Sequence, residues 1–132
     1  MAEFVMKKLV SDMGLSHEFY IESAATSREE IGNPVYQPVR KLLSQHGIDT
    51  SGKTARQMTK ADYLYYDYIV CMDQSNLRLM RYIIGEDTQN KVSLLMQWAG
   101  KEASVADPWY TGDFETTYTD ILEGCKAMLK QI

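Results

Sequence analysis

Tyr68-Ile69-Val70-Cys71-Met72 is an uncharged apolar run in the middle of the chain, and the fold class follows from it. Its length is that of a strand, and its continuous apolarity indicates that other elements cover both of its faces, as in a parallel sheet. A second apolar run, from Val92 to Trp98, predicts another strand of this kind. A shorter run, Phe19-Tyr20-Ile21, predicts a third.

Helical patterns lie before, between and after these runs. Apolar residues recur at helical spacing at the start and the end of the chain, and turn residues separate the segments between them. Helices are predicted over residues 1–13, from Pro38 to Gln45, shortly after Thr59, over 76–84 and from Phe114 to the end. The alternation of helix and strand predicts a single α/β domain over residues 1–132, with three layers and a mostly parallel sheet.

Capping residues mark where three of these helices begin. Thr59-Lys60-Ala61-Asp62 has the pattern of a capping box, with Asp in place of the usual Glu. Asp73 or Ser75 can cap the helix over 76–84, and Asp113 can cap the last one. The stretch over 99–112 is predicted to be a loop.

The composition is that of an ordinary globular protein with a net charge of −4. Lys and Arg are scattered among acidic residues, which argues against a nucleic-acid partner. Cys71 and Cys125 each lie within an apolar segment, which favours buried free thiols and a reducing cytoplasm. The first ten residues are too short and too charged for a signal peptide or a membrane span, and no membrane partner is expected.

Asp107-Pro108-Trp109-Tyr110 is the stretch most suggestive of chemistry. Pro108 restricts the backbone of Asp107 and stiffens the turn, which suits a carboxyl group that must protonate a leaving oxygen. The two aromatic residues could stack on a flat ring at the mouth of a pocket. Asp-Pro is also a common dipeptide of surface turns, so the motif alone leaves both readings open.

In its context this stretch resembles the general-acid loop of the low-molecular-weight protein tyrosine phosphatases. Other segments match that family in the same order along nearly the whole chain. They are Met1–Val5, Ser23–Ser27, Ile31–Pro34, His46–Ile48, Ala55–Gln57, Asp67–Asp73 and Ser75–Arg78. The resemblance implies a phosphotyrosine phosphatase I-like fold.

It also implies a cytoplasmic phosphomonoesterase that needs no cofactor and no metal. In this family a Cys thiolate within a Cys-x5-Arg loop attacks phosphorus at a helix N-terminus, where amides and the Arg hold the phosphate. The substrates implied are phosphotyrosine in proteins and small aryl phosphates. The Trp109-Tyr110 pair favours phosphotyrosine over phosphoarginine.

The resemblance assigns roles to eight residues of this sequence. Asp107 is the general acid. Trp109, Tyr110 and Glu29 are substrate-binding, Glu29 standing where the family often carries an aromatic residue. Ser23, Pro108, Arg56 and Asp73 are supporting residues: the family serine steadies the catalytic loop, and Arg56 and Asp73 match a pair that links two loops near the site. A His that supports the loop in many members has no counterpart around Gly52-Lys53.

The nucleophile has no counterpart in these 132 residues. Six residues separate Cys71 from Arg78, one more than the loop allows, and Gln131 stands where Cys125 would need an Arg. The loop and the first central strand of the sheet are expected immediately before Met1. The sequence as printed is therefore expected to be inactive, with a homo-oligomer or a rearranged sheet compensating for the missing strand.

Two alternatives remain from the sequence. A non-enzymatic, shortened relative could act as a protein-binding or oligomerising module. An arsenate reductase on the same fold would need additional redox cysteines near a flexible segment, and the two apolar-flanked cysteines do not supply them.

Overall fold

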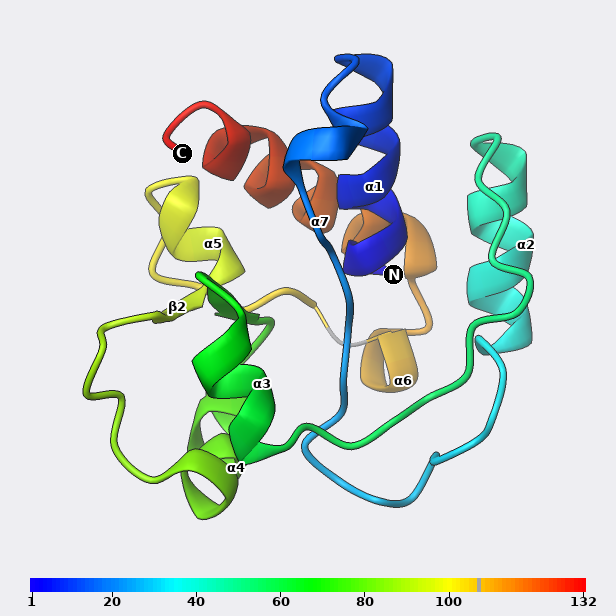
Figure 1. Cartoon of the computed structure of the whole chain (residues 1–132). Helices are drawn as coiled ribbons and strands as arrows, with labels where there is room; N and C mark the ends of the chain where they lie inside the picture. Colours follow the sequence, from blue (N-terminus) through cyan, green and yellow to red (C-terminus); the bar gives the residue numbers. More distant parts are fainter. Residues whose placement is uncertain (107) are drawn as a thin grey trace.

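The computed structural model describes residues 1–106 and 108–132, apart from the side chains of Trp109 and Tyr110 (Figure 1). The elements within them are α1 (Ala2–Asp12), a 3-10 helix η1 (Ser16–Glu18), α2 (Gln37–Gln45), α3 (Lys60–Tyr65), β1 (Ile69–Cys71), α4 (Gln74–Ile84), β2 (Val92–Leu94), α5 (Leu95–Trp98), α6 (Pro108–Thr111) and α7 (Phe114–Leu129).

The described sheet consists of β1 and β2, which run parallel with Ile69 opposite Val92 and Cys71 opposite Leu94. Side chains of β1 alternate between two apolar clusters. Val70 packs against the cluster built by α1, α5 and α7, whereas Ile69 and Cys71 join the cluster that α4 completes. Helices therefore cover both faces of the sheet, which confirms the predicted α/β layering.

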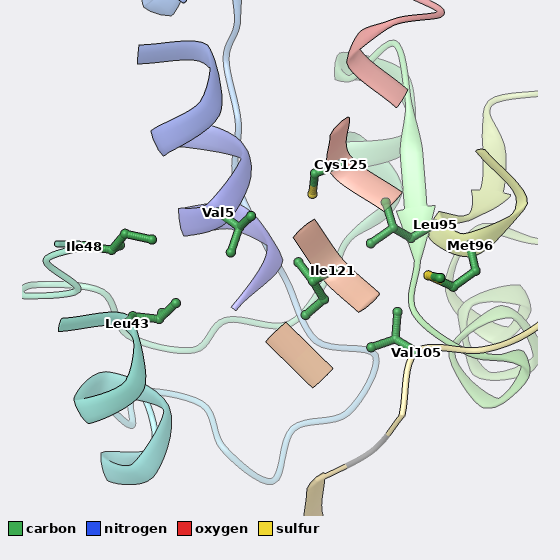
Figure 2. Packing of buried hydrophobic residues seen from close by; sticks show 8 residues of the cluster. All are labelled: Val5, Leu43, Ile48, Leu95, Met96, Val105, Ile121 and Cys125. Carbon is green, nitrogen blue, oxygen red and sulfur yellow. The ribbon is translucent and has the colours of Figure 1, made fainter. Parts of the chain in front are cut away.

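Helix α7 organises the larger cluster (Figure 2). Ile121 and Cys125 project from it toward Val5 of α1 and Leu95 of α5. These four side chains are at most 3% exposed. A fully buried aliphatic side chain stabilises a fold by roughly 1.5–3 kcal/mol, so this cluster is a main source of stability.

One glycine lets α7 approach α5 closely. A Cβ placed on Gly124 would lie 2.5 Å from Cγ of Leu95, which is closer than packed atoms tolerate. Because Leu95 is 1% exposed, its side chain has little space into which it could retreat. Position 124 thus requires glycine for the observed packing.

The helix starts confirm the capping predictions. Thr59 and Asp62 form a reciprocal capping box at the start of α3. At α4 the cap is Asp73 rather than Ser75, with the amide of Asn76 donating to its carboxylate at 2.8 Å. Asp113 accepts from the amide of Thr116 at 3.0 Å and caps α7.

Two predicted strands differ from the structure. Residues 19–24 follow no regular ladder, and only the next residue, Ala25, forms an isolated parallel bridge, with Gln57. β2 ends at Leu94, and α5 takes the rest of the apolar run, because the side chain of Gln97 folds back to accept from the amide of Leu94 at 3.0 Å. A short buried helix and a buried strand have the same apolar pattern, so the sequence could not separate them.

Both cysteines are buried free thiols, which confirms the prediction for Cys71 and Cys125. The predicted loop over 99–112 contains the short helix α6. In the part of the chain that the structure describes, none of the helices combines the length and the apolarity that crossing a bilayer requires.

Candidate functional site

The segment that leads to Asp107 is anchored on two elements. Asp107 itself lies outside the described residues, as do the side chains of Trp109 and Tyr110. Just before it, the amide of Val105 donates to the carbonyl of Met72 at 2.9 Å, beyond the carboxyl end of β1. The hydroxyl of Thr117, on α7, donates to the carbonyl of Ala106 at 2.7 Å.

The segment after Asp107 returns to the same helix. Pro108 begins α6, and the amide of Gly112 donates to its carbonyl at 2.8 Å. Asp113 then caps α7, and the Thr116 hydroxyl and amide that donate to it lower the pKa of Asp113. Helix α7 therefore holds the chain on both sides of the proposed acid, through Thr117 before it and Asp113 after it.

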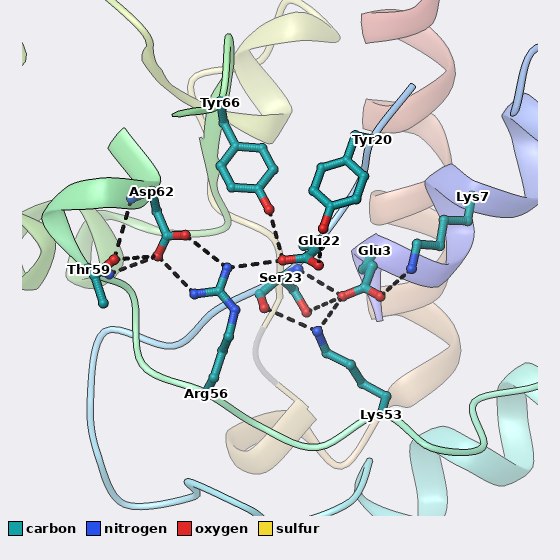
Figure 3. Close-up of polar contacts among 10 residues, drawn as sticks. All are labelled: Glu3, Lys7, Tyr20, Glu22, Ser23, Lys53, Arg56, Thr59, Asp62 and Tyr66. Carbon is teal, nitrogen blue, oxygen red and sulfur yellow. Dashed lines mark hydrogen bonds and ion pairs between the residues drawn. The ribbon is translucent and has the colours of Figure 1, made fainter. Parts of the chain in front are cut away.

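A buried carboxylate joins three segments at the start of α1 (Figure 3). Oε1 of Glu3 accepts from the amide and the hydroxyl of Ser23, at 2.8 and 2.7 Å. The ammonium of Lys53 lies 2.8 Å from the same oxygen, and that of Lys7 lies 2.7 Å from Oε2. The side chain of Glu3 is only 3% exposed. α1, the extended chain at Ser23 and the loop at Lys53 are thus held together by one group.

The surroundings of Glu3 keep it ionised. Burial by itself would raise its pKa, but hydrogen bonds from Lys53, Lys7 and Ser23 outweigh burial and hold the pKa at about 2. A carboxylate that accepts from two ammonium groups and an amide is stable in its charged form. The cluster therefore carries one net positive charge beside the first turn of α1.

A second network surrounds Arg56 (Figure 3). Its guanidinium donates to both carboxylate oxygens of Asp62, at 2.8 and 3.0 Å, and to the carboxylate of Glu22 at 3.3 Å. Glu22 also accepts from the hydroxyls of Tyr20 and Tyr66, both at 2.8 Å. The guanidinium lowers the pKa of Asp62, and the two phenols lower that of Glu22. This network ties the start of α3 to the extended segment 19–24.

The predicted pairing of Arg56 with Asp73 is wrong. Arg56 pairs with Asp62 and Glu22, whereas the carboxylate of Asp73 is engaged as the cap of α4. Asp62 lies six residues beyond Arg56 and presents both oxygens to the planar guanidinium, which is the geometry that Arg favours.

The other predicted residues are dispersed. Ser23 lies beside Glu3, next in sequence to Glu22, so the extended segment joins the two networks. Glu29 is exposed in the loop that precedes the isolated bridge of Ile31 with Ala55. Pro108 is half-buried at the start of α6.

Neither cysteine has the properties of a nucleophile. Burial raises the pKa of Cys71 to about 11 and that of Cys125 to about 12, so both remain thiols near neutral pH. Nor do the described residues bring three His, Cys, Asp or Glu side chains together in a group that could hold a metal ion.

Sequence reasoning missed Glu3 and Lys53. A signal for Glu3 existed, because it lies on the same helix face as Met6 and Val10, three and seven residues later, and a carboxylate there is expected to be buried and paired. For Lys53 no pattern pointed to a partner fifty residues away in the chain.

Comparisons with known proteins agree with this architecture. The sequence profile of the family described as "Low molecular weight phosphotyrosine protein phosphatase" matches residues 1–132. The low molecular weight phosphotyrosine protein phosphatase of Gallus gallus is 41% identical over 135 residues, covering 98% of this chain and 85% of that protein.

Solved structures give the same result. The crystal structure of YfkJ from Bacillus subtilis superposes with a TM-score of 0.93 at 31% identity, covering 99% of this chain and 84% of that one. The structure of DARP, a Drosophila arginine phosphatase, superposes with a TM-score of 0.85 at 29% identity, covering 98% and 86%. The chain belongs to the low molecular weight phosphotyrosine protein phosphatase family.

Proposed function

We propose that this protein, as a low-molecular-weight protein tyrosine phosphatase, acts on phosphotyrosine with Asp107 as the general acid. The observation that carries the proposal is the family match over all 132 residues, which includes the Asp107-Pro108-Trp109-Tyr110 stretch. The anchoring of Val105, Ala106 and Asp113 supports it, because a general acid must be held in a fixed place.

Each residue has a chemical task in this proposal. Asp107 protonates the phenolic oxygen as the bond to phosphorus breaks, so that a neutral phenol leaves. Trp109 and Tyr110 stack on the departing ring, and Glu29 lies at the rim. No cofactor and no metal takes part in these steps.

The nucleophile of the family's reaction has no counterpart among these residues. Cys-x5-Arg does not occur in the sequence, and the two thiols present are buried. We therefore propose that the 132-residue polypeptide by itself does not hydrolyse phosphate esters. Turnover of p-nitrophenyl phosphate by the pure polypeptide would contradict this.

A fusion tests the acid directly. The Cys-x5-Arg segment of a relative is joined in front of Met1, and hydrolysis of a phosphotyrosine peptide is measured. Asp107→Asn in this fusion should lower kcat by about 10²–10⁴-fold, since general acid catalysis supplies a factor of that size. Asp67→Asn, at an exposed position outside the proposed site, is the matched control. An equal effect of both variants, or none at Asp107, would remove Asp107 from the mechanism.

Substrate class is tested with the same fusion. We expect phosphotyrosine to be hydrolysed faster than phosphoarginine, because the Trp109-Tyr110 pair offers faces on which a phenyl ring stacks. A preference for a phosphoarginine peptide would reverse this assignment. Two unpaired buried thiols support a place in the reducing cytoplasm.

We also propose that the chain forms a homodimer. β1 forms a ladder with β2 on one edge, and its other edge has no ladder within the described residues. Tyr20, in the extended segment, is 63% exposed. We expect a second copy of the chain to cover the open edge of β1 and the exposed ring of Tyr20. Light scattering should give the mass of a dimer, which Tyr20→Lys should reduce, and a strictly monomeric mass would refute the proposal.

A further inference from the structure

The two lysines that hold Glu3 are not equivalent (Figure 3). Lys7 stands one helical turn from Glu3 on the same helix, and its side chain is 48% exposed. Lys53 comes from a distant loop, and its side chain is 21% exposed. Besides its contact with Glu3, the ammonium of Lys53 donates to the carbonyl of Ser23 at 3.2 Å. Lys53 therefore contacts both partners of the Glu3–Ser23 hydrogen bonds, and we see no such contact for Lys7.

The Glu3 carboxylate fixes the orientation of the Ser23 hydroxyl. An ionised carboxylate can only accept, so the hydroxyl proton must point at Oε1 of Glu3. The lone pairs of Ser23 Oγ then remain for another donor. Ser23 is exposed next to the first turn of α1, and its oxygen can meet an incoming loop only as an acceptor.

We propose that Lys53 is a positioning residue of the phosphatase site: by neutralising Glu3 and holding the Ser23 backbone, it keeps Ser23 oriented to accept a hydrogen bond from the loop that carries the phosphate. This inference rests on the proposed function, in which such a loop adjoins α1. It assigns to a lysine a supporting task for which the sequence offered no residue.

The charged and titratable groups around Glu3 support this reading. They are Lys7 on α1, Lys53 on the facing loop and the amino group of Met1, which in turn faces the Cys125 thiol of α7. The pKa of Glu3 lies at about 2, so the carboxylate that accepts from Ser23 is ionised at neutral pH.

Replacing Lys53 by histidine introduces a group at this position whose titration can be followed. In Lys53→His, a protonated imidazole beside the Glu3 carboxylate should have a pKa raised above the ordinary value of about 6.5. A raised folded-state pKa means that the imidazolium stabilises the fold below the unfolded-state pKa and that this contribution disappears as pH rises through the folded-state pKa. The NMR shift of the Ser23 amide should follow the same titration.

Lys7→His is the matched control. It places a histidine beside the same carboxylate but on the oxygen that Ser23 does not share. We expect the Ser23 amide to move little as this histidine titrates. Equal titration of the Ser23 amide in both variants would mean that any charge near Glu3 suffices, which would overturn the specific assignment to Lys53.

Charge removal gives the second readout. In Lys53→Met, hydrogen exchange of the Ser23 amide should be faster by about tenfold, the effect of weakening one charge-assisted hydrogen bond. Lys53→Arg should restore slow exchange, and Lys7→Met should change it less. Unchanged exchange in Lys53→Met would show that Lys53 does not position Ser23. Because these measurements use the 132-residue chain without turnover, they can fail independently of the proposed catalytic function.

Discussion

Glu3 and Glu22 are two carboxylates at the extended segment 19–24. Glu3 binds this segment from α1, and Glu22 belongs to it, but their surroundings differ. Each accepts at least three hydrogen bonds or ion pairs, and the pKa of each is lowered. The side chain of Glu3 is 3% exposed and has two ammonium partners. That of Glu22 is 33% exposed, and its partners are one guanidinium and two phenols.

Burial determines how much such a carboxylate contributes to stability. Water can replace a lost partner of Glu22, and solvent screens its attraction to Arg56, so the pair contributes little. The side chain of Glu3 is 3% exposed, so water has little access to its carboxylate, and a lost partner leaves a buried charge poorly compensated. Similar lists of contacts therefore correspond to different free energies.

The largest expected effect comes from Glu3→Ala. It leaves the amide of Ser23 and two ammonium groups without their acceptor, and we expect it to lower the free energy of unfolding by about 3 kcal/mol. Glu22→Ala should cost well under 1 kcal/mol, about the value of an exposed ion pair. Urea denaturation of both variants measures the difference. Equal losses would mean that burial does not separate the two carboxylates.

Lowering the pH should destabilise the fold mainly through protonation of Glu3. Its folded-state pKa is about 2, below the value of about 4.3 expected for an unfolded chain. The stabilisation is fully present above the unfolded-state pKa and is lost as pH falls toward the folded-state pKa, a loss on the order of 2 kcal/mol between pH 5 and pH 2. Stability measured against pH should flatten in this range in Glu3→Gln and keep most of its slope in Glu22→Gln.

Arg56→Lys changes the cation of the more exposed network. An ammonium cannot reproduce the two parallel hydrogen bonds to Asp62, but the site is partly exposed, with side-chain exposures of 37% and 15%. We expect a loss of about 1 kcal/mol, less than for Glu3→Ala. Thermal unfolding gives the measurement, and Lys60→Arg, on the exposed side of α3, serves as control. A loss as large as that of Glu3→Ala would show that the Arg56 network is more protected than its exposure indicates.

The smallest effect is expected for Tyr66→Phe. The ring still stacks on Tyr20, with centroids 5.8 Å apart, and only one donor to Glu22 disappears. Stability should fall by about 0.5 kcal/mol, and the pKa of Glu22 should rise toward its ordinary value. NMR titration of the Glu22 carboxyl carbon follows the second effect. An unchanged pKa would mean that the phenol does not stabilise the charged form.

Local patterns predicted much of the fold. The apolar run around Val70, the capping box at Thr59 and the cap at Asp113 each depend on neighbours within a few residues, and the structure confirms all three. The end of β2 was missed because the choice between strand and helix at Leu95 depends on the side chain of Gln97 and on packing against α7. Tertiary contacts of that kind leave no periodic signal.

The site was less predictable than the fold. The roles of Asp107, Trp109 and Tyr110 came from the family resemblance and remain proposals. The pairing of Arg56 with Asp73 came from the family resemblance, whereas in this fold Asp62 meets the guanidinium and Asp73 caps α4. Glu3 and Lys53 meet through the tertiary fold alone.

The glycine at position 124 has a mechanical consequence. Helix α7 is a stiff rod that is held against Leu95 at Gly124, and its first residue, Phe114, lies ten residues or about 15 Å away along the axis. A larger side chain at position 124 could tilt α7 by about 5°. That tilt would move the start of the helix, and the segment that precedes it, by about 1 Å. A displacement of that size at a reacting group can reduce the rate by about a hundredfold. A methyl group at position 124 would thus act on the proposed acid through the tilt of α7, without touching the substrate.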